Sequence, residues 1–364
     1  MALLVAASAL PAAAAARRAP QNFYGVSWDN SLNYRPQVDQ ERQWDLMASS
    51  GVESVRALFS WAVAQPSPHG QFDFSITDRL VARAAKRRIQ LLPVVFEAPA
   101  WAQLNRGRRN SPPRRPRDYA AYLRALVSRY GPRGSFWSIR PDLPRRPVRA
   151  WQIWNEPDLK FYWNVRRGRA AAWPKGYVKL LKAARKAIKS RDRGADVVLA
   201  GISEEPWTQV RRLYRLKARR LFDVVAIHPY NADVRTALTA VRLVRGVMRG
   251  GHDSRKPIWV TELGWPAARG RVQKGLLGGL KRLVTTDNGM AKRVAGAYNS
   301  FLDKSRTRHY GIGRLYWFTW ATSYLPGEAG IWDFAGLVMT NPVGFVPTPA
   351  LAAYKRSARR NEAR

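Results

Sequence analysis

The chain contains no cysteine among its 364 residues. This absence excludes disulfide bonds, thiolate metal sites and a cysteine nucleophile. The fold must therefore be stabilised by an apolar core, for which a hydrophobic fraction of 46% is sufficient. Histidine is also scarce. The four histidines, at positions 69, 228, 252 and 309, are far apart in the sequence and form no His-Glu-x-x-His motif. We therefore expect no metal and no cofactor.

Acidic residues are few, because 25 Asp and Glu face 63 Lys and Arg, giving a formal net charge of +38. Three explanations compete: an acidic polysaccharide as substrate or matrix, a nucleic acid as partner, or a compositional bias that places Arg on every solvated surface. The sequence has no zinc-finger, RNP or basic-zipper signature, which disfavours nucleic acid. The other two explanations stay open, since net charge informs on association and not on fold.

Long apolar runs are almost absent. The first sixteen residues, MALLVAASALPAAAAA, resemble the apolar core and cleavage region of a secretory signal peptide. We predict that residues 1–20 are a signal peptide with a short linker, and that the protein is secreted. The run is short and contains Pro11, and no other run approaches ~18 residues, so we expect no membrane span in the mature protein.

Strand-like and helix-like segments alternate through the rest of the chain. Apolar or alternating runs predict eight strands, at 23–28, 52–61, 89–96, 148–154, 197–202, 224–228, 257–263 and 315–320. Helical periodicity predicts eight helices, at 39–50, 76–88, 117–130, 177–190, 208–216, 234–248, 290–304 and 349–358. This alternation is typical of an α/β fold, and eight units favour a single-domain (β/α)8 TIM barrel over residues 21–358, followed by a basic tail at 359–364. No Gly-rich phosphate loop follows the first strand, which argues against a dinucleotide fold.

Two glutamates occupy matching places in this pattern. Glu156 follows the fourth predicted strand and Glu262 ends the seventh. Because barrel active sites lie at the C-terminal ends of strands, both carboxylates should point into one mouth. Glycoside hydrolysis needs such a pair: one carboxyl group protonates the leaving oxygen, and the other attacks the sugar or activates water.

The residues around both glutamates make the pattern specific. Asn155-Glu156-Pro157 follows a Trp-rich strand, and the run Thr-Glu-Leu-Gly-Trp-Pro at 261–266 lies three units later. This pattern resembles the clan of retaining glycoside hydrolases whose catalytic Glu residues end strands four and seven of a barrel. Within the clan it is most similar to family 39, then to family 5. The resemblance implies that Glu156 is the acid/base and that Glu262 is the nucleophile.

The same resemblance assigns supporting residues by position. Asn155 is expected to bind the sugar 2-hydroxyl, and Arg56, on the second strand, to support the nucleophile. His228 and Tyr230 match a pair on strand six, whose Tyr hydroxyl donates to the nucleophile. Trp320 matches a Trp that forms a floor for the sugar. Structural roles compete for several of these: a barrel ion pair for Arg56, and core packing for His228 and Trp320.

Other residues near strand ends could line a sugar-binding cleft or belong to the core or rim. They are Trp28, Glu97, Trp101 and Trp265. Basic insertions at 106–117 and 166–169 follow strands, so we expect them on the active-site side. The basic segment at 133–146 follows a helix and should lie on the opposite face.

The sequence thus favours a secreted retaining glycoside hydrolase acting on a polysaccharide or oligosaccharide by double displacement. One alternative is a non-catalytic carbohydrate-binding or cell-envelope protein that keeps the barrel, and another is a basic surface-binding protein. The sugar stays open between xylan, glucan, mannan, galactan and an acidic polymer.

Overall fold

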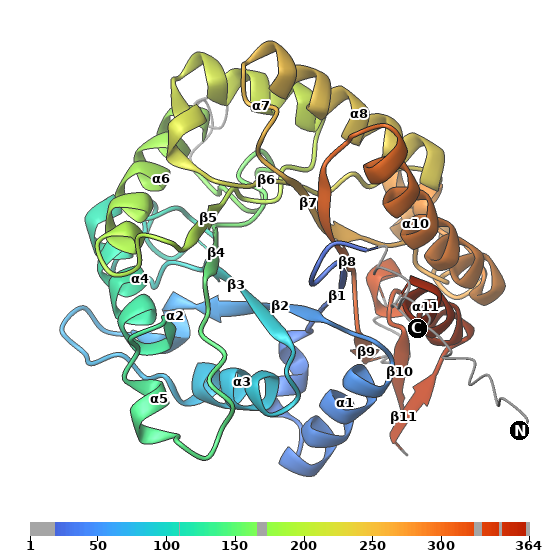
Figure 1. Ribbon diagram of the computed structural model, residues 1–364, viewed down its shortest axis with the longest axis horizontal. Helices are drawn as coiled ribbons and strands as arrows, with labels where there is room; N and C mark the ends of the chain where they lie inside the picture. Colours follow the sequence, from blue (N-terminus) through green and yellow to red (C-terminus); the bar gives the residue numbers. More distant parts are fainter. Residues whose placement is uncertain (1–18, 109, 166–172, 324–329, 342–343, 362–364) are drawn as a thin grey trace, which may run out of the picture.

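The structure is a computed structural model that describes residues 19–361 apart from 109, 166–172, 324–329 and 342–343. The predicted signal peptide, the basic insertion at 166–169 and the last residues of the basic tail lie outside the described residues. Figure 1 looks down a ring of strands that is surrounded by a ring of helices. The expected (β/α)8 barrel is therefore confirmed.

Eight parallel strands form the inner ring. They are β1 (Tyr24–Ser27), β2 (Ser54–Ser60), β3 (Gln90–Phe96), β4 (Ala150–Ile153), β5 (Asp196–Val198), β6 (Val225–Ile227), β7 (Ile258–Leu263) and β8 (Ile312–Trp317). Continuous pairing runs in the order β5-β4-β3-β2-β1-β8-β7-β6. Single bridges between Val198 and Val224 and between Ile202 and Ile227 connect β5 with β6 and close the ring.

Helices cover the outside of the ring. The longer ones are α1 (Gln37–Ser49), α3 (Ser75–Lys86), α4 (Pro116–Tyr130), α6 (Trp173–Lys189), α7 (Pro206–Arg215), α8 (Val234–Gly250), α10 (Asp287–Thr307) and α11 (Pro349–Asn361). Short helices are α2 (Trp61–Ala64), α5 (Phe136–Ile139) and α9 (Lys274–Leu277), with 3-10 turns η1 (Asn30–Tyr34), η3 (Ala218–Leu221), η4 (Gly278–Leu283) and η5 (Ile331–Phe334). Within the described part of the chain, no helix is both long and apolar enough to cross a membrane.

The end of the eighth strand differs from the prediction. β8 ends at Trp317, and the chain then forms a small sheet of β9 (Ala321–Ser323), β10 (Val338–Asn341) and β11 (Gly344–Pro347). The backbone at 319–320 already pairs with this sheet region, since Leu337 and Val338 donate to the carbonyls of Thr319 and Trp320. The aromatic run at 315–320 has no polar alternation, so its sequence did not indicate where the barrel strand stops.

Strand alternation fills the barrel in layers. Side chains in the barrel interior form an apolar cluster: Leu92, Ala150, Val198, Val224, Ala226, Trp259 and Tyr316. Two residues further along their strands come polar side chains, Gln152 after Ala150 and Thr261 after Trp259. The neighbouring positions Trp151 and Ile153 instead pack in the larger cluster that includes the helices. The barrel therefore presents a polar layer on an apolar base, just below its C-terminal mouth.

Candidate active site

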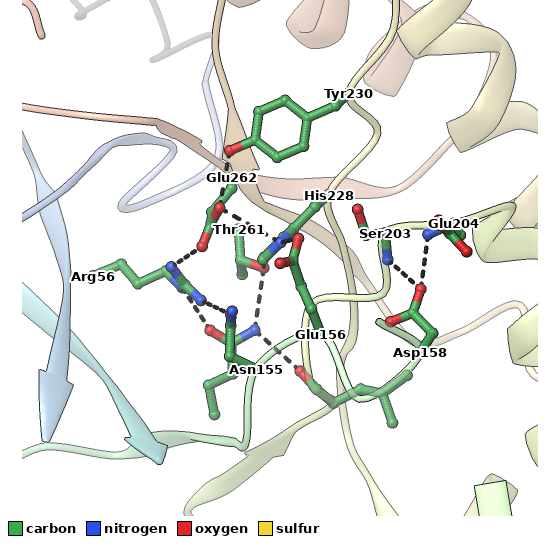
Figure 2. A network of polar contacts seen from close by, with 12 residues as sticks. Arg56, Asn155, Glu156, Asp158, Ser203, Glu204, His228, Tyr230, Thr261 and Glu262 are labelled. Carbon is green, nitrogen blue, oxygen red and sulfur yellow. Dashed lines mark hydrogen bonds and ion pairs between the residues drawn. The ribbon is translucent and has the colours of Figure 1, made fainter. Parts of the chain in front are cut away.

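Arg56 lies at the centre of the polar layer. From β2 its guanidinium reaches three acceptors: Nε donates to Gln152 Oε1 at 2.7 Å, and Nη2 donates to Asn155 Oδ1 at 2.7 Å. Nη1 donates to Glu262 Oε1 at 2.6 Å, and this ion pair is almost wholly buried. Figure 2 shows the guanidinium between these side chains. Since Arg56 donates to the Asn155 carbonyl oxygen, the amide nitrogen of Asn155 is the atom left to donate to a substrate.

Glu262 has both carboxylate oxygens engaged. Besides the bond from Arg56, its Oε2 accepts a hydrogen bond from the Tyr230 hydroxyl at 2.9 Å. Tyr230 comes from the segment after β6 and packs against Trp332, with ring centroids 5.1 Å apart. Burial raises the pKa of Tyr230 well above its ordinary value, and the Glu262 charge adds to this, so the hydroxyl stays a donor.

Glu156 follows β4 in a sharp change of chain direction. Trp154 and Glu156 both have left-handed backbone conformations, with φ of 70° and 37°. Such conformations are strained for residues other than glycine and persist only where surrounding structure holds them. Here Glu156 Oε1 lies 2.7 Å from His228 Nδ1, in a hydrogen bond that is wholly buried.

His228 is held from two sides. Its Nε2 lies 3.0 Å from Thr261 Oγ1, and Gln152 also hydrogen-bonds this hydroxyl. A Cβ atom on Gly201 would overlap the imidazole ring, so the absence of a side chain at 201 makes room for it. His228 is therefore a buried histidine that fixes the position of Glu156. It combines the two roles that its sequence position left open, packing in the core and contact with the site.

The two glutamates have opposite pKa shifts. Burial raises the pKa of Glu156 above its ordinary value; His228 offsets part of this effect, and the charge of Glu262 adds to it. Burial acts on Glu262 in the same direction, but the charges of His228 and Arg56 and the hydrogen bonds from Tyr230 and Arg56 bring its pKa below the ordinary value. Near neutral pH, Glu156 is the better proton donor and Glu262 the better anion.

Glu156, His228 and Glu262 offer ligand atoms that all lie within 4.8 Å of one another. These residue types could in general hold a cation. In this structure both ring nitrogens of His228 are engaged by Glu156 and Thr261, and the Arg56 guanidinium already neutralises Glu262. The donor set therefore fits a proton-transferring pair of carboxyl groups better than a metal site.

Asp158 fastens the Glu156 turn to the neighbouring loop, as Figure 2 shows. Its Oδ2 accepts hydrogen bonds from the backbone N–H groups of Ser203, at 3.0 Å, and Glu204, at 2.7 Å. Its Oδ1 is buried with no hydrogen-bond partner among the described residues. The pKa of Asp158 is raised to about 7, and burial is the main cause. The hydrogen bond from the Glu204 N–H acts against this rise, and the charge of Glu156 adds to it.

A cavity of about 360 Å³ opens above these groups. Of the residues considered for a sugar cleft, Trp28 and Glu97 line it, together with Arg56, Asn155 and Glu262. Other lining residues are Ser27, Asp29, Asn30, Ala57, Leu58, Val94, Phe96, Asn110, Phe161, Tyr162, Phe318 and Thr319. The side chains of Ser27, Asn30 and Asn110 each have a buried oxygen without a hydrogen-bond partner among the described residues. Such atoms suit a polar ligand rather than an apolar one.

Three tryptophans do not line this cavity. Trp320 was expected to form a floor for a sugar, but its side chain is fully buried and its indole N–H donates to Gln43 on α1. Because β8 ends three residues before Trp320, the cavity receives Phe318 instead. Trp265 is buried against Trp317, and Trp101 packs on Trp61.

Four residues of the site were not singled out from the sequence: Gln152, Asp158, Thr261 and Phe318. Gln152 carried a usable signal, since a polar residue at an inward position of a barrel strand needs a partner. Thr261 shares this inward register next to Glu262. Asp158 gave no comparable signal, because its partners are backbone groups 45 and 46 residues away.

The fold and site define a (β/α)8 barrel with two buried carboxyl groups at its C-terminal mouth. Comparison with protein families agrees with this class over part of the chain: the model described as "Glyco_hydro_42: Beta-galactosidase" matches residues 33–103. A search of curated proteins returns no match.

Solved structures share the fold over most of the chain. A family 39 glycoside hydrolase from Bacteroides cellulosilyticus matches with a TM-score of 0.69 and 18% identity, over 94% of this chain and 64% of that one. A family 39 enzyme from Xanthomonas axonopodis matches with a TM-score of 0.65 and 18% identity, over 93% of this chain and 66% of that one. A monomeric β-xylosidase from Caulobacter crescentus matches with a TM-score of 0.65 and 16% identity, over 94% of this chain and 69% of that one. The chain thus spans about two thirds of the length of these proteins, and the similarity to the glycosidase barrel is established at the level of fold.

The buried carboxyl of Asp158 generates a prediction on stability. Its pKa is raised on folding, so the native state binds more protons than the unfolded state between pH 4 and 7. The free energy of unfolding of the wild type should therefore fall, relative to Asp158→Asn, as the pH rises through about 7, by no more than about 4 kcal/mol. Urea denaturation of both proteins from pH 4 to 8 measures this difference. Parallel pH dependences in the two proteins would contradict it.

Proposed function

We propose that this protein is a retaining glycoside hydrolase in which Glu262 is the nucleophile and Glu156 the acid/base. The observation that carries the proposal is the pair of buried carboxyl groups, with ligand atoms within 4.8 Å of one another and with opposite pKa shifts. Carboxyl groups about 5–5.5 Å apart favour a covalent intermediate, whereas inverting enzymes need about 6.5–9.5 Å to admit a water molecule. The shared fold of glycoside hydrolases of several families adds support.

In the first step, a Glu262 carboxylate oxygen attacks the anomeric carbon of the bound sugar. The bond from this carbon to the leaving oxygen breaks, and that oxygen takes the proton of Glu156. Arg56 and Tyr230 keep Glu262 ionised and oriented until it attacks. The product of this step is a glycosyl ester on Glu262 and a free alcohol.

In the second step, the ionised Glu156 accepts a proton from water, and the water oxygen attacks the anomeric carbon. The ester bond breaks and Glu262 leaves as a carboxylate, so both glutamates return to their starting states. His228 holds Glu156 in place while Glu156 changes from acid to base. It stays hydrogen-bonded to Glu156 from a fixed position between Thr261 and Gly201. No cofactor takes part in either step.

The charges of the cavity support a neutral sugar. Within the described part of the chain, its lining contains the carboxylates of Asp29, Glu97 and Glu262, and a single cationic side chain, Arg56, which is paired with Glu262. On this lining, a carboxylate on the bound sugar would meet net negative charge and no unpaired guanidinium. The structural neighbours include a β-xylosidase and an exo-β-1,4-mannosidase, whose named sugars are neutral. We therefore propose that an acidic polymer is not a substrate of this cavity, although the basic composition had kept it among the candidates.

The stereochemistry of hydrolysis tests the mechanism. Reducing-sugar release over xylan, glucan, mannan, galactan and aryl glycosides first identifies a substrate. Proton NMR of the first product formed should then show the anomeric configuration of the substrate, because two displacements occur at one carbon. Inversion would exclude the covalent intermediate. If the wild type binds polysaccharide but releases no reducing sugar from any substrate, the protein would be better described as a carbohydrate-binding protein.

The pH dependence of kcat/KM tests the two assignments. Ionised Glu262 sets the acid limb, which should lie below about pH 4.5, and protonated Glu156 sets the basic limb, which should lie above that value. Glu156→Gln should remove the basic limb and lower kcat/KM by about 10²–10⁴ for substrates with poor leaving groups. Glu204→Gln alters an exposed side chain nearby and should keep both limbs. A basic limb that survives Glu156→Gln would refute the acid/base assignment.

Export is a separate part of the proposal, and it is supported by the apolar and small residues of positions 1–16. Expression of the full chain in a bacterial host should give a processed protein outside the cytoplasm, with a new N-terminus near residues 17–21. Leu3→Asp combined with Leu4→Asp should retain it inside, because the apolar core of the signal is interrupted. Cell fractionation and N-terminal sequencing decide the matter, and an unprocessed cytoplasmic wild type would disprove export.

A further inference from the structure

A hollow of about 1100 Å³ lies between α7, α8 and the connection from α10 to β8. Five exposed arginines line it: Arg211, Arg215, Arg242, Arg249 and Arg308. We call this hollow the arginine groove. Its remaining lining residues are Tyr214, Leu243, Gly246, Val247, Gly250, Gly251 and Tyr310, so no Asp or Glu is among the residues that line it.

The five guanidinium groups are uncompensated. Among the residues that the structure describes, no carboxylate lies within ion-pair distance of any of them. Other arginines of the chain are engaged: Arg83 and Arg87 pair with Glu41, and Arg129 with Asp78. Five unpaired cations around one concavity repel one another, and an anionic ligand would relieve this repulsion.

The arginine groove opens on the face opposite the catalytic mouth. Arg215 and Arg249 lie at the C-terminal ends of their helices, and Arg308 follows α10 in the short connection to β8, so all three lie near the N-terminal ends of the strands. Two further hollows, of about 310 and 550 Å³, lie on this same basal face and share Arg149. Their basic lining residues are Arg133, Arg145, Arg146, Arg149, Lys189, Arg191, Arg193 and Arg314, against only Asp192 and Asp196.

The two ends of the barrel therefore differ in charge. The charged side chains that line the cavity of the mouth are three carboxylates and one paired arginine, whereas those that line the basal hollows are cationic apart from Asp192 and Asp196. The cations of the basal hollows lie where an anion can bind without reaching the paired carboxyl groups of the mouth.

We propose that the arginine groove, together with the two other basal hollows, binds an anionic polysaccharide that carries carboxylate or sulfate groups, and that this polymer is held rather than cut. Guanidinium groups bind carboxylate and sulfate oxygens through paired hydrogen bonds. The groove would anchor the protein to a charged matrix while the opposite mouth acts on a neutral sugar. Binding at the groove is independent of catalysis, although the choice of a carbohydrate polymer rests on the proposed function.

The groove favours a polysaccharide over single-stranded nucleic acid. Stacking of bases needs aromatic faces that are open to the ligand. Of the two tyrosines in the groove, Tyr214 is stacked on Phe222, with centroids 6.3 Å apart, and its hydroxyl donates to Asp253. The ring of Tyr214 is thus occupied on one face, and the groove offers charge more than stacking.

Two variants with equal loss of charge test the proposal. The groove variant replaces all five groove arginines by Gln. The control variant replaces five exposed arginines elsewhere: Arg35, Arg106, Arg108, Arg114 and Arg124. Three of these belong to the insertion after β3, on the mouth side. Binding of polygalacturonate, heparin, uncharged dextran and a 20-base-pair DNA duplex is measured by titration at 50 and 200 mM salt, with thermal melting to verify folding.

We expect polygalacturonate or heparin to bind the wild type at 50 mM salt, to weaken at 200 mM, and to bind the groove variant about tenfold or more weakly. The control variant should lose no more than about threefold, and the groove variant should keep activity on the neutral substrate. Equal losses in the two variants would overturn the site, since only total charge would then matter. Tighter binding of duplex DNA, lost in the groove variant, would replace the polysaccharide by nucleic acid. Cleavage of the anionic polymer would refute its separation from the catalytic cavity.

Discussion

The buried guanidinium of Arg56 is the constraint on which the polar layer of the barrel depends. A charge taken out of water must be compensated, and removal of one partner of a buried pair leaves the other charge uncompensated. Arg56 meets this demand with Gln152, Asn155 and Glu262, which come from β4, from the turn that follows it and from β7. One side chain of β2 therefore fixes the relative positions of the two segments that carry the glutamates. Because buried ion pairs are often no more stabilising than apolar pairs, its placement here is better explained by positioning than by stability.

From this centre the environments of the two glutamates diverge. Glu262 receives a cation on one oxygen and a tyrosine hydroxyl on the other, so its charged form is favoured. Glu156 is equally buried, and among the described residues its close hydrogen-bond partner is the imidazole of His228, so its pKa is raised. The same residue type thus acquires opposite pKa shifts within a few ångströms, which is the difference that the proposed division into acid and nucleophile requires. The strained backbone at Glu156 belongs to this arrangement, because Asp158 and His228 hold the turn that the sheet alone would not form.

The alternation of apolar runs was sufficient to predict the barrel, since each strand–helix unit must bury its apolar faces against its neighbours. It also located both glutamates, because the ends of parallel strands share one side of the barrel. It did not locate Trp320 correctly. A strand end that is displaced by a few residues changes which side chain faces the mouth, and the aromatic run after Leu315 has no alternation of polar and apolar residues to mark that end. Asp158 and Gly201 acquire their roles only from contacts between distant loops, and neither periodicity nor local composition contains those contacts. The sheet of β9, β10 and β11 was missed for a related reason, since its strands are three or four residues long.

Net charge was the least informative property of the sequence for the chemistry of the cavity, and the structure explains why. Charges in water are screened over about 8–10 Å at physiological salt, so arginines on the basal face contribute little to the potential at the catalytic carboxyl groups. The potential in the cavity is set by its own lining, whose charged side chains among the described residues are acidic apart from Arg56. A total of +38 is therefore compatible with a cavity that disfavours anions. What the total charge could not reveal is location, and location separates a surface that attracts an anionic polymer from a cavity that excludes one. The basic composition and the paired glutamates thus concern two different faces of the barrel, and neither needs to explain the other.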